Sequence, residues 1–177
     1  MSLPFLIASL PSLSMDAPPP LSVEAFREAC AQALPASQAA VVDALLDGAP
    51  CDSSFVKAWR DVDAQIRNTV ARKRAARRGV DAAPFLRPVE GFELTAMRAV
   101  EAAFDEPDPL LRERAIDRAR LEALDRLQGP QPMTFEALLA YAVRLRIVTR
   151  WAACDPVKGD AFLQEISRLD GMPPPSF

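Results

Sequence analysis

One stretch of the sequence concentrates side chains that are suited to binding another molecule. Between positions 67 and 78 it carries six cations and no acid. The members of this basic stretch are Arg67, Arg72, Lys73, Arg74, Arg77 and Arg78, and Asn68 lies beside the first of them. Such a run is typical of an electropositive patch for phosphate, nucleic acid or an acidic protein face. It is equally typical of a solubilising helix end whose charges pair with acids elsewhere in the fold. Because asparagine is a poor interior helix former, we expect Asn68 to bond across to another helix or to a partner.

The absence of histidine excludes a large class of chemistry. None of the 177 residues is a histidine, so the chain has no Ser-His or Cys-His nucleophile pair, no His-ligated zinc or haem and no imidazole acid or base. It also has no glycine-rich phosphate loop and no EF-hand loop. The sequence therefore predicts no catalytic residue, no metal ligand set and no cofactor site.

Carboxylates are the remaining groups that could act as acids or bases. Those between positions 109 and 128 alternate with arginines, which predicts a solvated, salt-bridged face and not a shielded catalytic carboxyl. An enzyme that uses carboxylates or arginines alone stays a third alternative. Its candidate residues are Asp43, Asp61 and Asp63, which lie near predicted apolar stripes.

The cysteines and the first residues bear on the compartment. Cys30, Cys51 and Cys154 are odd in number and widely spaced, which favours a reducing cytoplasm over a disulfide framework. We expect Cys30 to be a small buried hydrophobic residue. The apolar run Phe5–Leu10 is too short for an export signal or a membrane span, and we predict an extended N-terminal segment packed against the body.

The composition is typical of one soluble globular domain. Half of the residues are apolar, a quarter are charged, and the net charge is −3. We therefore expect a single helical domain over 1–177, with a bend or seam in the Pro-containing loop at 80–92. The acidic total provides no global field for nucleic acid or anionic membranes.

Apolar residues recur at helical spacing in nearly every segment, between Pro and Gly breaks. The predicted fold class is all-α, an irregular bundle of about seven helices. The predicted helices are 22–34, 37–47, 53–78, 93–104, 109–128, 134–151 and 155–171. Helix-capping residues begin several of them, and glycines end several.

Several stretches together resemble a known family. They are FLIASLP at 5–11, PPLSVEAF at 19–26, Trp59 with IRN at 66–68 and RAAR at 74–77, PFLRP at 84–88, PLLRERAIDR at 109–118, and FEALLAY at 135–141 with RW at 150–151. The set resembles an uncharacterised bacterial family encoded beside V/A-type ATPase subunits, which looks like a shortened form of the ATPase's C subunit. The resemblance implies an all-helical protein without catalytic residues. This chain is much shorter than that C subunit, so the resemblance implies an accessory part of its central-stalk coupling role.

Together these observations predict a non-catalytic helical adaptor. The resemblance implies V/A-type ATPase subunits as protein partners, and a cytoplasmic location that is peripheral to the inner membrane through that complex, without direct insertion. The predicted contact residues are the basic stretch and Asn68. The alternative is a nucleic-acid or regulatory binder that uses the same basic helix end, although interleaved aromatic residues for base stacking are lacking.

Overall fold

The computed structural model describes residues 2–154, and this part of the chain is built from α-helices with no β-strand. The predicted all-α class is confirmed. The helices are α1 (Leu3–Ser9), α2 (Val23–Ala33), α3 (Ala36–Asp47), α4 (Ser54–Arg78), α5 (Leu94–Ala103), α6 (Pro109–Gln128) and α7 (Phe135–Ala153), with a short 3-10 turn, η1 (Ala83–Phe85). The predicted helix at 155–171 lies outside the described residues.

Local capping explains where the long helices begin. The side chains of Ser22, Ser53, Asp108 and Thr134 each accept a hydrogen bond from a backbone N–H in the first turn of α2, α4, α6 and α7, respectively. These bonds satisfy amide groups that have no partner within the helix. At the other end of α4, Gly79 has φ +66°, a left-handed conformation that favours glycine.

The prediction of an extended N-terminal segment is wrong, because residues Leu3–Ser9 form helix α1. Pro4 lies in the first turn, where a missing N–H costs nothing, and Pro11 follows the end of the helix. Helix α1 is stabilised by packing, since Leu6 is 2% exposed within the common core and α1 contacts α2. A helix this short depends on such tertiary contacts.

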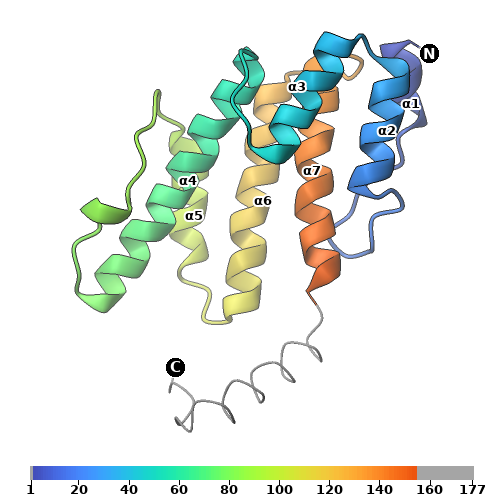
Figure 1. The fold of residues 1–177 in the computed structure, drawn as a ribbon. Coiled ribbons are helices and arrows are strands. Elements are labelled where there is room, and N and C mark those ends of the chain that lie inside the picture. Colours follow the sequence, from blue (N-terminus) through green and yellow to red (C-terminus); the bar gives the residue numbers. More distant parts are fainter. Residues whose placement is uncertain (1, 155–177) are drawn as a thin grey trace, which may run out of the picture.

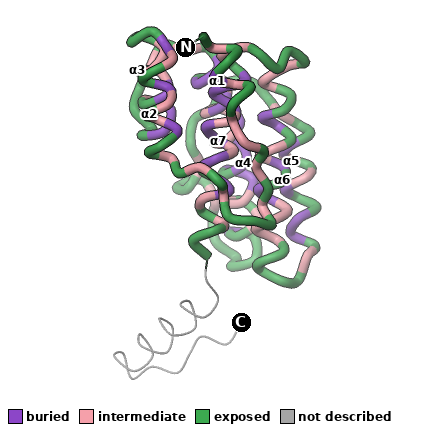
Figure 2. The backbone as a smooth tube through the Cα atoms, turned by 90° about the vertical axis from the view of Figure 1, so that its right-hand side faces the viewer, coloured by how far each residue is buried: buried purple, intermediate pink, exposed green. Residues whose placement is uncertain are grey.

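The long helices lie side by side, with α6 between α4 and α7 in the view of Figure 1. Helix α6 contacts α4, α5 and α7, and α2 and α3 also contact α7. Apolar side chains from all seven helices join in one buried cluster, and the inward faces of the helices are buried in Figure 2. None of the helices in the described part is long and apolar enough to cross a membrane.

Candidate functional site

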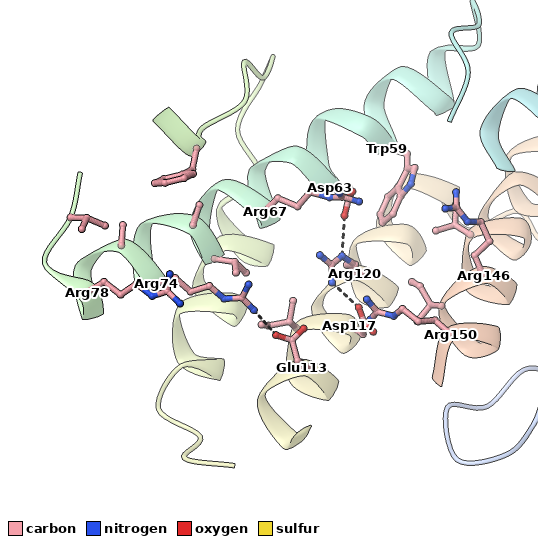
Figure 3. A pocket seen from close by; sticks show the side chains of 18 residues that line it. Trp59, Asp63, Arg67, Arg74, Arg78, Glu113, Asp117, Arg120, Arg146 and Arg150 are labelled. Atoms are coloured by element: carbon pink, nitrogen blue, oxygen red, sulfur yellow. Dashed lines mark hydrogen bonds and ion pairs between the residues drawn. The ribbon is translucent and has the colours of Figure 1, made fainter. Parts of the chain in front are cut away.

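A cleft of about 700 Å³ opens between α4 and α7, with side chains of α6 forming its floor (Figure 3). Its apolar lining residues are Trp59, Val70, Ala71, Ala75, Val80, Phe85, Ile116, Val143 and Ile147. Its charged lining residues are Asp63, Arg67, Arg74, Arg78, Glu113, Asp117, Arg120, Arg146 and Arg150. The cleft therefore combines apolar patches on its walls with charged side chains on both its floor and its rim.

Positive side chains outnumber negative ones in this cleft. Six arginines face three carboxylates, although the whole chain carries a net charge of −3. Arg74 binds Glu113 at 2.9 Å and Arg67 binds Asp63 at 2.6 Å. The cleft is thus a locally cationic surface on an acidic protein.

Two arginines on opposite walls of the cleft are open to an acidic ligand. Arg78 and Arg146 are exposed and form no ion pair among residues 2–154. Arg146 donates one long hydrogen bond, of 3.4 Å, to the Leu45 carbonyl. A guanidinium carries five N–H donors, so most of the donors of both groups are available to a carboxylate from outside.

A buried ionic network holds the floor of the cleft together. Asp117 is 0% exposed and accepts hydrogen bonds from Arg120 Nη1 at 2.7 Å, from Arg150 and from Trp151 Nε1 at 2.7 Å. Arg120 also donates to Asp63 at 2.9 Å. Burial acts to lower the pKa of Arg120, but the charges of Asp63 and Asp117 outweigh it and hold this pKa above its usual value. The network joins α4, α6 and α7 through fully paired charges.

The prediction that the carboxylates of 109–128 form a solvated face is wrong for Asp117. Helix α6 lies against three other helices, so its buried surface is wider than an amphipathic stripe and includes this carboxylate. Both Asp117 oxygens are occupied by donors from Arg120, Arg150 and Trp151. An aspartate bonded in this way is suited to fixing helices in place, since no oxygen is left free to act on a substrate.

Helical geometry explains which members of the basic stretch reach the cleft. With 3.6 residues per turn, positions 74 and 78 fall within about 20° of position 67 around the helix, whereas 72 and 73 point more than about 100° away. Accordingly Arg67, Arg74 and Arg78 line the cleft, and Arg72 and Lys73 do not. Arg77 is used within the fold, because it donates to the Phe104 carbonyl at 2.6 Å and lies over the Phe104 ring.

The structure also brings in arginines that the sequence interpretation did not single out. Arg120, Arg146 and Arg150 complete the cleft from α6 and α7. The signal for the α7 pair was present, since positions 146 and 150 are one turn apart and follow the same face as Val143 and Ile147. What was missing was the knowledge that this face lies opposite α4.

Asn68 is buried and bonds to the α4–α5 loop. Its side chain donates to the Arg87 carbonyl at 2.8 Å and accepts from the Arg87 N–H at 2.8 Å. Gln65 accepts from the Glu93 N–H at 2.6 Å, and Asp61 accepts from the Glu90 N–H at 3.1 Å. These three side chains follow one face of α4 and fasten the loop along it. Both ends of the Asn68 amide are thus occupied within the fold.

Replacing this amide should loosen the loop. We expect Asn68→Leu to lower the free energy of unfolding by about 1–3 kcal/mol, because the Arg87 N–H and C=O lose their partners. The same variant should accelerate hydrogen exchange of the Arg87 backbone amide. Urea denaturation and exchange mass spectrometry measure the two effects, and Arg72→Leu on the exposed face of α4 is the control. An unchanged exchange rate at Arg87 would show that the amide pair does not hold the loop.

The other residues considered for chemistry are engaged or inaccessible. Asp43 forms an exposed ion pair with Arg27 at 2.7 Å. Burial raises the pKa of the Cys30 thiol to about 12, so this cysteine is not a thiolate at neutral pH and is a small buried apolar group. Asp63 lies in the cleft but is held by Arg67 and Arg120.

Comparison with protein families places a match in the second half of the chain. Residues 89–171 match a family described as a protein of unknown function (DUF2764). The matched range covers α5, α6 and α7 and less than half of the chain. Comparison with curated proteins and with solved structures finds no significant match.

The DUF2764 match contains the floor and one wall of the cleft. Asp117, Arg120, Arg146 and Arg150 fall inside the matched range. The arginines of α4 lie outside it. The cleft thus combines DUF2764-like helices with a wall from the preceding half of the chain.

Proposed function

We propose that this protein is a non-catalytic helical adaptor that binds an acidic surface of a larger protein through the cleft between α4 and α7. The observation that carries the proposal is the excess of arginines over carboxylates in a cleft that also has apolar lining residues. Complementary charge steers association and sets the orientation of partners. Apolar lining residues add contact area that a purely electrostatic site lacks.

The V/A-type ATPase is the first partner to test. Stretches spread along the chain resemble an accessory family that looks like a shortened C subunit, whose role is coupling between the central stalk and the membrane ring. An all-helical fold agrees with that resemblance. In this proposal the adaptor acts in the cytoplasm, at the periphery of the inner membrane, and is held there by the complex.

A second candidate function is nucleic-acid binding by the same cationic cleft. It is less well supported, because the one tryptophan that lines the cleft, Trp59, is only 8% exposed, which leaves little aromatic surface for base stacking. Salt dependence separates the two functions. A steep fall in affinity for duplex or single-stranded DNA with salt concentration, from submicromolar binding at moderate salt, would favour the second.

Charge reversal in the cleft tests the adaptor function. We expect Arg78→Glu with Arg146→Glu to abolish co-purification of V/A-type ATPase subunits with the tagged full-length chain. Neither arginine forms an ion pair in the described part of the chain, so the fold should be retained, which circular dichroism checks.

The matched control is Arg72→Glu with Arg98→Glu. It makes the same change in net charge at two exposed positions outside the cleft and should leave recovery of the complex unchanged. Equal recovery of ATPase subunits with wild type and with the cleft variant would contradict the proposed role of this cleft.

A further inference from the structure

We infer that the cleft receives one face of an acidic, amphipathic α-helix from the partner protein. The inference rests on the proposed function and names the form of the acidic surface that the adaptor recognises. The occupant becomes a further helix packed against α4, α6 and α7, in the helix-in-groove mode of recognition.

The shape of the cleft suits a helix. Its lining on α4 runs from Trp59 to Arg78, which at 1.5 Å per residue is about 28 Å, or roughly five turns. The α7 wall lies across the α6 floor from α4 (Figure 3). A volume of about 700 Å³ holds a row of side chains from one helix face, with the backbone of the occupant above the rim.

The distribution of side chains in the cleft determines where the occupant needs apolar and acidic residues. Val80 and Phe85, at the end of the cleft near Arg78, are 53% and 64% exposed and offer apolar contacts, whereas Ile116, Val143 and Ile147 are buried and give the cleft its apolar backing. Arg78 and Arg146 are exposed on opposite walls. A helix that lies between these walls therefore needs an apolar stripe at heptad spacing, with carboxylates on both of its flanks.

Hydrogen bonding favours a helix over an extended peptide. An extended segment brings backbone N–H donors that need acceptors, whereas a helix satisfies its own backbone. The carboxylates in the cleft, Asp63, Glu113 and Asp117, are each already bound to an arginine. The available groups on the rim are guanidinium donors, which match carboxylate acceptors on the side chains of the occupant.

A synthetic helix provides the test. The probe is a fluorescein-labelled peptide of about three heptads, with Leu at positions a and d, Glu at e and g, and Ala elsewhere. Its glutamates disfavour self-pairing at neutral pH. The comparison peptide has the same composition with the leucines moved off the stripe. Fluorescence anisotropy with the full-length chain measures affinity, and circular dichroism measures the helix induced in the peptide.

We expect the amphipathic peptide to bind about tenfold more tightly than the comparison peptide and to become more helical on binding. Arg78→Glu with Arg146→Glu should weaken binding by about tenfold or more. Arg72→Glu with Arg98→Glu should change the affinity less than about twofold. These outcomes require the apolar stripe and both charged walls at once.

Other occupants would overturn the inference in distinct ways. Equal binding of the two peptides shows that the cleft recognises negative charge and does not require an apolar stripe on one face of the peptide helix. Displacement of the probe by a synthetic peptide of residues 155–171 assigns the cleft to a segment of this chain itself. Stronger displacement by an oligonucleotide assigns it to nucleic acid. If the cleft variant loses ATPase subunits while neither peptide binds, the adaptor function stands and the helical occupant is wrong.

Discussion

The variant Asp117→Ala is expected to lose about 3–5 kcal/mol of unfolding free energy, the largest effect that we expect from a single ionic change among residues 2–154. The carboxylate is 0% exposed and accepts from Arg120, Arg150 and Trp151. Arg150 is half exposed and turns to water when its partner is lost. The side chain of Arg120 is only 14% exposed. It keeps its ion pair with Asp63 but loses its ion pair with Asp117, so one of the two carboxylates that balance its charge is gone.

Urea denaturation followed by circular dichroism measures the effect of Asp117→Ala. The control is Asp125→Ala on the same helix, since Asp125 is exposed and binds Arg144 at the surface. An exposed pair contributes at most about 1 kcal/mol. If Asp117→Ala fails to fold, Asp117→Asn keeps the side-chain volume and should still lose stability relative to wild type. A loss under about 1 kcal/mol in either Asp117 variant would show that the network does not hold the three helices together.

The variant Trp59→Ala is expected to lower the free energy of unfolding by about 3–5 kcal/mol. Trp59 is 8% exposed and belongs to the common core, although one edge of it lines the cleft. Removal of the indole leaves a cavity among packed side chains of α4 and its neighbours.

Phe85→Ala is the comparison for Trp59, because Phe85 lines the same cleft but is 64% exposed. Its loss should cost under about 1 kcal/mol. Urea denaturation of both variants distinguishes a core residue from a surface contact. If Trp59→Ala also costs under about 1 kcal/mol, the ring belongs to the binding surface and not to the core.

Within residues 2–154, helix positions were predictable where local chemistry decides them. The N-caps Ser22, Ser53 and Thr134 begin helices as expected, and Gly79 follows the end of α4. A cap acts through hydrogen bonds within three or four residues, so it can be predicted from residues that are neighbours in sequence. The N-terminal turn was missed because α1 is stabilised by burial of Leu6 against the rest of the fold and not by a cap.

The candidate site was only partly predictable. The basic stretch was visible, and its i, i+7, i+11 subset at Arg67, Arg74 and Arg78 marks one helix face. The roles of Asn68 and Arg77 inside the fold were not visible, because their partners at Arg87 and Phe104 lie far away in sequence. The DUF2764 match is of unknown function, so the partner remains a proposal.

Amino-acid types and their periodicity alone determined that this chain is helical, that it has no histidine chemistry, and that cations gather at the end of one long helix. Only the tertiary structure decided that Asp117 is buried, and that arginines of α4, α6 and α7 line one cleft. The physical reason is the separation in sequence over which each kind of interaction acts. Helix formation and capping depend on residues within a few positions, whereas burial and electrostatic environment depend on which distant helices pack together.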